Sequence, residues 1–598
     1  MLVPVSRRTT VALLGATALS PLALKASHAA EAASPADAAF ANVTKNWLDG
    51  ALKLSPVSAT QIGDHRFDHE IDDMSEAGRK ARRDFSKSVS AKLDAIDKTK
   101  LNRANQVDHA ILSNQLRFDQ WDDEVLQSWA WDPLGYQNLA GGALYLTIAR
   151  EFAPLPDRLR SATARMEKLP GLLRQARENL QPARVPLVHA QTLSKQNLGI
   201  VSISDGLIAP HADQLKGRDR ARLLKAVEGV RAAVKEHQEW IDKTLAPNAK
   251  GQFRLGAKLY DQKLAFALNS PMTRQEIHSR AEAALKGIRA QMYDISRGVL
   301  AGKKGAPKAP KHPTDAQQQK VIEAALALAY AERPARDQVV PAAKTALAQA
   351  TEFVRAKDLI TLPDAPVQII IMPEFQQGVA VAYCDPPGPL DKGQSTFFAV
   401  SPIPKDWTDE QTESFLREYN SRGIHELTVH EAMPGHYVQL WHANQYPSII
   451  RAVLYSGPFV EGWACYAEDM MAEQGYLDRD PLYLLAHLKL DLRAVANAIL
   501  DSAIHVDGMT REEAMHLMTV TAFQQEREAA GKWIRASVSS AQLPTYFVGQ
   551  SEHIALRKEA EQRWGATFNL KRYHDTVTSF GSPPVRYARA LMFDEPIG

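Results

Sequence analysis

Apolar residues recur at three- and four-residue intervals through most of this chain, and that spacing is typical of amphipathic helices. The clearest examples are RMEKLPGLLRQARENL at residues 165–180, ARLLKAVEGVRAAVKEHQEWIDKTLAP at 221–247 and RAEAALKGIRAQMYDISRGVL at 280–300. Residues with high helix propensity dominate these windows. The pattern therefore predicts a mainly α-helical protein.

The pattern changes between residues 367 and 400. The runs VQIIIM, GVAVAY and STFFAV are short, rich in β-branched and aromatic residues, and separated by Pro and Gly. They predict a small antiparallel sheet. The part from residue 379 to 400 either offers a free edge to an extended peptide or covers a cleft as a structural hairpin. Helical spacing returns after Trp407.

A Gly-, Pro- and Lys-rich run, AGKKGAPKAPKHPTD, occupies residues 301–315. It cannot continue a helix, so we expect an exposed loop. We place the lobe boundary here, with an N-terminal helical lobe at residues 30–300 and a C-terminal lobe at 316–598.

The first 29 residues have the order of an export signal. Arg7 and Arg8 precede an apolar stretch at residues 11–24, and small residues follow it. This order predicts cleavage after Ala29 and a periplasmic or secreted protein. The arginine pair is typical of the twin-arginine route.

Composition and net charge limit the classes of molecule that the protein is expected to bind. The 598 residues include 71 Lys+Arg and 69 Asp+Glu, a formal net charge of +2, so no general attraction to nucleic acid or anionic membranes is expected. No other apolar run is long enough to span a bilayer, which excludes stable membrane insertion after signal cleavage. Only Cys384 and Cys465 are present, so a disulfide framework is excluded, and we expect two free thiols rather than one bridge. The oligomeric state is left open.

The segment HEAMPGH at residues 430–436 carries candidate metal chemistry. His430 and Glu431 resemble the start of the zinc-protease signature HExxH, in which two His share one helical face. His436 lies six residues on, which turns a regular helix by about 240° net and directs it elsewhere. Pro434 breaks the helix and Gly435 tolerates unusual dihedrals, so the same insertion can return His436 to the metal.

A rival motif overlaps this one. HELTVH, with His425, Glu426 and His430, places two His five residues apart, and a one-residue π-bulge would align them. It resembles the HExxxH signature of the dipeptidyl-peptidase III family. From spacing alone, both motifs stay open.

A third ligand is expected from EGWACYAEDMMAEQG. Glu461 opens this predicted helix, 25 residues beyond His436. Glu468 lies two turns further on the same face, where it either orients a ligating His or serves as a substitute ligand. Cys465 lies between them and is expected to pack as a small apolar residue rather than to bind metal.

Together, LTVHEAMPGHYVQLW and GPFVEGWACYAEDMM resemble the bacterial family DUF885. The similarity continues through DLRAVANAILDSAIHVDGMTREEAMHLM, YFVGQ and FNLKRYHDTVTSFGSPP. This resemblance implies a gluzincin-like helical protein that binds Zn²⁺ through His430, His436 and Glu461, with Glu431 as catalytic base, and it favours HEAMPGH over HELTVH. Two departures are Tyr437, where many members have a second His, and the cysteine within EGWACYAE.

The implied protein is an exported zinc peptidase of mainly α, two-lobed, metallopeptidase-like fold, acting on short peptides by metal-activated water. The four candidate donors to the oxyanion lie in family-like blocks: Arg493, His505, Tyr546 and His574. Two alternatives remain: a zinc hydrolase of a non-peptide amide or ester, and a non-catalytic exported binding protein of the same fold.

Overall fold

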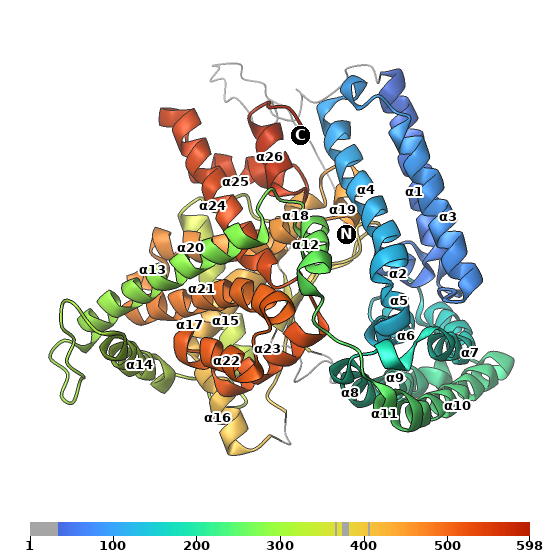
Figure 1. Cartoon of the computed structure of the whole chain (residues 1–598), viewed down its shortest axis with the longest axis horizontal. Coiled ribbons are helices and arrows are strands. Elements are labelled where there is room, and N and C mark those ends of the chain that lie inside the picture. The colour runs from blue at the N-terminus through green and yellow to red at the C-terminus, as the bar shows by residue number, and fades with distance from the viewer. Residues whose placement is uncertain (1–33, 365–366, 373–381, 405–406, 598) are drawn as a thin grey trace, which may run out of the picture.

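Helices build almost the whole molecule, as the sequence predicts (Figure 1). The structure is a computed structural model and describes residues 34–364, 367–372, 382–404 and 407–597. The N-terminal helices lie on one side and the C-terminal helices on the other (Figure 1). The expected signal peptide and most of the GVAVAY run lie outside the described residues.

Eleven α-helices form the N-terminal side: α1 (Pro35–Leu54), α2 (Pro56–Gln61), α3 (Glu76–Asp94), α4 (Arg103–Trp121), α5 (Ser128–Trp131), α6 (Pro133–Ile148), α7 (Leu155–Asn179), α8 (Leu187–Gln196), α9 (Gly199–Ile203), α10 (Gly217–Trp240) and α11 (Ala246–Asn248). The expected periodicity is visible in α10, where Leu223, Val227, Val230 and Val234 are buried at three- and four-residue spacing. They pack with α6 and α7 in one apolar core.

The remaining helices form the C-terminal side: α12 (Gly256–Leu268), α13 (Arg274–Leu300), α14 (Asp315–Ala331), α15 (Val339–Ala356), α16 (Asp409–Glu418), α17 (Ser421–Glu431), α18 (His436–Ala443), α19 (Ile449–Val453), α20 (Gly457–Gln474), α21 (Pro481–Ser502), α22 (Arg511–His516), α23 (Glu526–Val538), α24 (Pro544–Trp564), α25 (Leu570–Thr578) and α26 (Val585–Met592). Short 3₁₀ and π turns join several of them.

Helix α13 precedes the lobe boundary predicted at residue 300 but lies on the C-terminal side of the molecule. Helix α13 packs along α21 and α14, and Met292 and Tyr293 share a core with Leu488 and Leu492. It therefore belongs to the C-terminal body. The predicted loop between α13 and α14 is largely exposed, although the Tyr293 hydroxyl donates a hydrogen bond to the carbonyl of Pro310 at 2.6 Å.

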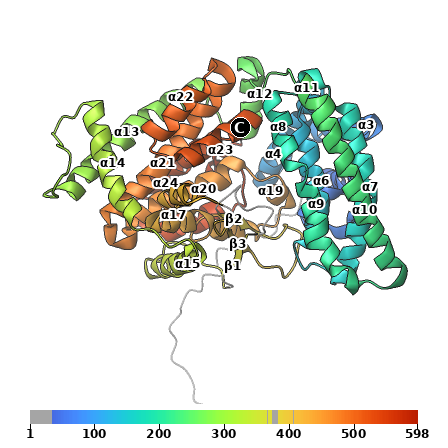
Figure 2. The ribbon, with the colours of Figure 1, turned by 90° about the horizontal axis from the view of Figure 1, so that it is seen from below.

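The three described strands form one mixed sheet in the order β1-β3-β2: β1 (Gln368–Ile371), β3 (Phe397–Val400) and β2 (Ala382–Asp385). Strand β2 pairs antiparallel with β3, as expected, but β1 pairs parallel with it. The purely antiparallel prediction is wrong because β1 skips its sequence neighbour, and strand composition carries no information on that choice. The sheet lies beside α15 and α17 (Figure 2).

Helices α20 and α24 cross at two glycines. A Cβ on Gly462 would lie 2.4 Å from the Cα of Gly549, and a Cβ on Gly549 would lie 1.9 Å from the carbonyl oxygen of Pro458. Only glycine permits this approach. The contact fixes the start of α20, and with it Glu461, against α24.

A buried ion pair joins the two sides. Nε of Arg451, next to α4, lies 2.6 Å from Oδ1 of Asp108, and both side chains are buried. Ile450 and Tyr587 extend the core that Phe40 and Leu112 begin. Among the described residues, no helix is both long and apolar enough to cross a bilayer.

Candidate metal centre

Helix α17 positions the first two candidate residues. Asn420 caps it, since its side-chain oxygen accepts hydrogen bonds from the backbone N–H groups of Arg422 and Gly423. The helix stays regular to its last residues, His430 and Glu431. Both side chains therefore project from a helix end that the cap and the core fix in place.

The chain then turns so tightly that one position excludes any side chain. A cis bond joins Met433 to Pro434, and the N–H of Gly435 donates to the carbonyl of Val429 at 2.9 Å. A Cβ on Gly435 would lie 1.9 Å from the carbonyl oxygen of His430. Helix α18 begins directly afterwards with His436. The helix therefore stops and restarts around the Pro-Gly pair, which returns His436 to the same side as His430.

Three donor atoms converge from these helices and α20. Oε2 of Glu461 lies 3.4 Å from Nε2 of His436 and 3.7 Å from Nε2 of His430. Ligands about 2.0–2.1 Å from a tetrahedral zinc are about 3.3–3.4 Å apart, so the set fits Zn²⁺ with little adjustment. The Glu461 side chain is 25% exposed, which leaves room for water or substrate.

Glu468 forms a hydrogen bond with the ring nitrogen of His430 that faces away from Glu461. Its Oε1 lies 2.6 Å from Nδ1 of His430, which leaves Nε2 free to face Glu461. Burial alone would lower the pKa of His430, but Cys465, Glu461 and Glu468 together raise it well above its usual value. A carboxylate in this position orients a ligating imidazole. Cys465 is buried on α20, the helix that carries Glu468. Cys384 and Cys465 are both free thiols.

The rival histidine points elsewhere. Nδ1 of His425 lies 2.9 Å from the hydroxyl of Tyr476, and burial followed by the charge of Arg422 lowers the pKa of His425 to about 4. Helix α17 has no π-bulge between His425 and His430. Among the described residues, the groups of convergent metal-binding side chains do not include His425. The geometry therefore favours HEAMPGH over HELTVH.

Glu431 faces the sheet. Its Oε2 accepts a hydrogen bond of 2.9 Å from the backbone N–H of Cys384 in β2, the edge strand of the described sheet. This bond orients the carboxylate, while Oε1 makes no hydrogen bond within the part of the chain that the structure describes. The β2–β3 hairpin thus positions Glu431, the candidate base. The same contact occupies part of the free edge of β2.

A cavity of about 880 Å³ opens beside His430 and Glu431. Helices α17, α20, α21 and α23 line it from the C-terminal body, and α8 adds Thr192, Lys195 and Gln196 from the N-terminal lobe. A space of this size accommodates a short peptide better than a folded protein.

The four donor candidates divide into two pairs. Tyr546 and Arg493 line this cavity. Burial and the charge of Glu461 raise the pKa of Tyr546, which keeps its hydroxyl protonated as a donor. Arg493 is already bonded to Glu528 and to the Tyr419 hydroxyl.

The other two candidates, His505 and His574, lie away from this cavity. Both rings are buried and are absent from the cavity lining among the described residues. Nε2 of His505 contacts the carbonyls of Ala536 and Ser539. His574 donates from Nδ1 to the carbonyl of Leu359, and burial lowers its pKa to about 3. Sequence position alone did not distinguish such buried histidines from cavity residues.

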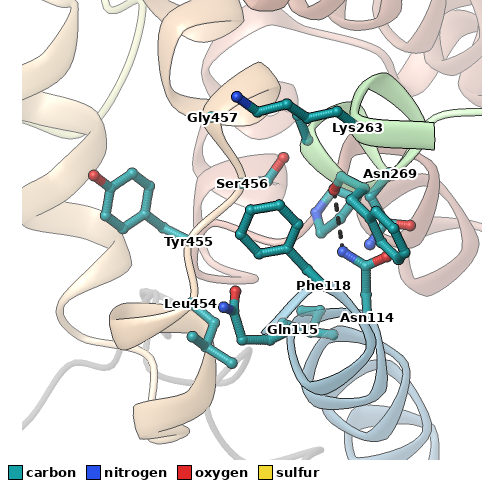
Figure 3. A pocket seen from close by; sticks show the side chains of 13 residues that line it. Asn114, Gln115, Phe118, Lys263, Asn269, Leu454, Tyr455, Ser456 and Gly457 are labelled. Atoms are coloured by element: carbon teal, nitrogen blue, oxygen red, sulfur yellow. Dashed lines mark hydrogen bonds between the residues drawn. The ribbon is translucent and has the colours of Figure 1, made fainter. Parts of the chain in front are cut away.

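Tyr455 is a residue that the motifs did not indicate. It lies between α19 and α20, and although 59% of its surface is exposed, partial burial and then the charge of Glu461 raise its pKa. A second cavity of about 220 Å³ lies next to it between α4, α12 and the start of α20. The Tyr455 ring points away from Asn114 and Phe118, which line the other side of that cavity (Figure 3). Its position six residues before Glu461 was the only available sequence signal.

Comparison with known proteins fits this architecture. The model of the family described as "Bacterial protein of unknown function (DUF885)" matches residues 56–592. A solved "putative lipoprotein of unknown function" from Shewanella oneidensis is 34% identical, with a TM-score of 0.79, over 93% of this chain and 99% of that one. A putative lipoprotein from Colwellia psychrerythraea, 17% identical with a TM-score of 0.75 over 94% of this chain and 99% of that one, shows the same fold. No curated protein matches. Since the family model covers nearly the entire described chain, this protein belongs to the DUF885 family of bacterial proteins.

Proposed function

We propose that the chain is an exported zinc-dependent peptidase that hydrolyses short peptides. The observation that carries this proposal is the convergence of His430, His436 and Glu461 beside Glu431. Two imidazoles and one carboxylate are the ligand set of many zinc peptidases. The adjoining cavity supplies space for a substrate.

His430, His436 and Glu461 would hold the zinc, which would supply a Lewis acid to lower the pKa of water and polarise a carbonyl oxygen. Glu431 takes the proton as the water oxygen attacks the peptide carbon, and then gives that proton to the leaving amine. The Cys384 N–H holds one oxygen of Glu431, so the other is directed to this proton. Tyr546, and Tyr455 on the linker before α20, are the protonated donors that we propose for the negative charge on the carbonyl oxygen, since the charge of Glu461 acts on both.

Export is part of the proposal. It rests on the arginine pair and apolar stretch of residues 1–29, and the titles of both solved relatives, which call them putative lipoproteins, support it. Protein isolated from the cell envelope should begin at Ala30. Full-length protein found only in the cytoplasm contradicts export.

Zinc analysis combined with peptide digestion tests the activity. We expect about one zinc per chain, for one ligand set, and cleavage of peptides in preference to a panel of non-peptide amides and esters. Glu431→Gln should keep its zinc and lose about 10² or more in rate, the usual scale for a general base. Glu461→Gln is the matched comparison and should lose zinc as well.

The outcomes separate the alternatives. Cleavage of amides or esters without peptides identifies a different zinc hydrolase. Protein that binds no zinc after purification without chelator supports a binding protein. A Glu431→Gln variant as fast as the parent removes Glu431 from the mechanism.

A further inference from the structure

The charges lining the large cavity are unevenly distributed. Beside His430 they are acidic, from Glu426, Glu431 and Glu468. On α21 and α23 they are mainly basic. This basic wall comprises Lys489, Arg493, Arg527, Lys532 and Arg535.

Two glutamates pair with two residues of the basic wall. Nζ of Lys489 lies 2.7 Å from Oε2 of Glu418, and Arg493 pairs with Glu528. Each pair is a hydrogen-bonded ion pair within the cavity wall. Arg527, whose guanidinium lies over the Trp407 ring, and Lys532 and Arg535 form no ion pair among the described residues, although the charges of Glu528 and Glu418 act on Lys532.

Lys532 is the unusual member because it is only 5% exposed. Within the described part of the chain, no acceptor bonds to its ammonium group, although the residue lines the cavity. Burial, and then the charge of Arg493, lower the pKa of Lys532 well below its usual value, against the opposing charges of Glu528 and Glu418. A buried lysine without a bonded acceptor can gain its proton and its ion pair together when an anionic ligand binds, because the anion offsets the cost of burying the charge.

Arg535 extends this site toward the metal centre. It lies three residues after Lys532 on α23, and residues at that spacing share a helical face. Its Nη2 donates to the Tyr546 hydroxyl at 3.2 Å and to Oε1 of Gln542 at 2.8 Å. The charge of Glu461 in turn acts on Tyr546. A ligand bound at Lys532 and Arg535 is therefore linked to the candidate metal centre through one side chain, that of Tyr546.

The cavity also meets a boundary at this wall. Helix α8 of the N-terminal lobe packs against α23 and contributes its own residues to the lining. An extended chain running from His430 toward α23 meets the contact between the lobes. A chain end fits that position better than a continuing polypeptide.

We propose that Lys532, assisted by Arg535, binds the free C-terminal carboxylate of the substrate, so that the enzyme removes short pieces from peptide C-termini. This inference rests on the proposed peptidase function and specifies its substrate class. An acidic side chain carries the same carboxylate, and the test distinguishes the two sources.

Binding to zinc-loaded Glu431→Gln protein tests the site without turnover. The probes are an N-acetylated tripeptide with a free C-terminus, the same peptide as its C-terminal amide, and an amide ending in Glu. The free acid should bind about 30-fold or more tighter than its amide, the scale for one buried charge pair. Lys532→Met should remove this preference, Lys532→Arg should restore most of it, and Lys558→Met, on the exposed face of α24, is the matched control.

Stability gives a second readout. An unpaired buried ammonium destabilises the fold, so Lys532→Met should raise the melting temperature of the ligand-free protein. If that variant fails to fold, Arg535→Gln, on the exposed side of the same site, should still weaken the preference for the free acid.

Three results overturn the inference: equal affinity of the parent for acid and amide, an undiminished preference in Lys532→Met, or tight binding of the Glu-containing amide that depends on Lys532. Hydrolysis is scored separately. A binding preference without peptide cleavage contradicts the proposed function and leaves the carboxylate site standing. Cleavage of acid and amide at equal rates contradicts only the carboxylate site.

Discussion

Oε1 of Glu468 lies 2.6 Å from Nδ1 of His430, so this carboxylate fixes which imidazole nitrogen faces the metal centre. Glu468→Gln should therefore weaken zinc binding by about 10–100-fold, the usual effect of losing such a partner. Chelator competition measures the change. Glu473→Gln, on the exposed end of the same helix, should bind zinc like the parent. Equal affinities for both variants contradict a supporting role for Glu468.

The two overlapping motifs make opposite predictions about zinc. His436→Ala removes a donor that lies 3.4 Å from Glu461 and should lose most of the metal. His425→Ala removes only a contact with Tyr476 and should keep it. Elemental analysis of both purified variants decides between them. Full zinc in His436→Ala together with loss in His425→Ala identifies HELTVH as the true motif.

Gly435→Ala tests the turn rather than the ligands. The added Cβ would lie 1.9 Å from the carbonyl oxygen of His430, so the backbone must move and carry His436 with it. We expect reduced zinc content and a loss of roughly 2–4 kcal/mol in unfolding free energy, as for overpacking in a rigid site. Gly171→Ala, an open position on the surface of α7, is the control. A variant with normal zinc and stability shows that the turn adapts.

Removing the hydroxyl of Tyr546 or of Tyr455 tests whether that side chain donates a hydrogen bond to the oxyanion. Tyr546→Phe should lower kcat about 10²–10³-fold with little change in zinc, the range for one oxyanion donor. Tyr455→Phe tests the second phenol near Glu461 in the same assay. If neither variant slows peptide hydrolysis, the donor comes from elsewhere in the cavity.

Stability should depend on pH through His65. Its ring lies between Asp68, 2.9 Å from Nδ1, and Asp391, 3.1 Å from Nε2. Burial opposes the charge, but the two carboxylates raise the pKa of His65 to about 9. A raised folded-state pKa gives stability that is complete below the unfolded value near 6.5 and lost as the pH rises through about 9.

His65→Gln should therefore cost about 1–3 kcal/mol at about pH 6, and the difference from the parent should shrink toward about pH 10. Urea denaturation at both pH values measures it. A difference that stays constant with pH assigns the effect to packing against Phe152 instead.

The sequence predicted the features that local pattern determines. Helical spacing placed α7, α10 and α13, and the family motifs identified the residues that the structure brings together at Glu461. It failed where the outcome depends on contacts between distant segments. The direction of β1, the packing of α13 on α21, and the burial of His505 and His574 all depend on tertiary neighbours.

The cavity residues illustrate the same limit. Lys532 occurs in an ordinary amphipathic helix, and in sequence it is indistinguishable from a solvated lysine. The packing of α23 against α16, α22 and α8 removes it from water. Tyr455 lies in a linker with no motif, and it is a candidate donor only because the charge of Glu461 acts on it.

The crossing of α20 and α24 has a consequence for how this protein can diverge. Because Gly462 and Gly549 touch through their backbones, neither position can gain even a methyl group unless the helices separate. Separation would carry Glu461 away from both histidines. A side chain at either glycine is therefore expected to disperse His430, His436 and Glu461 although all three residues remain in the chain.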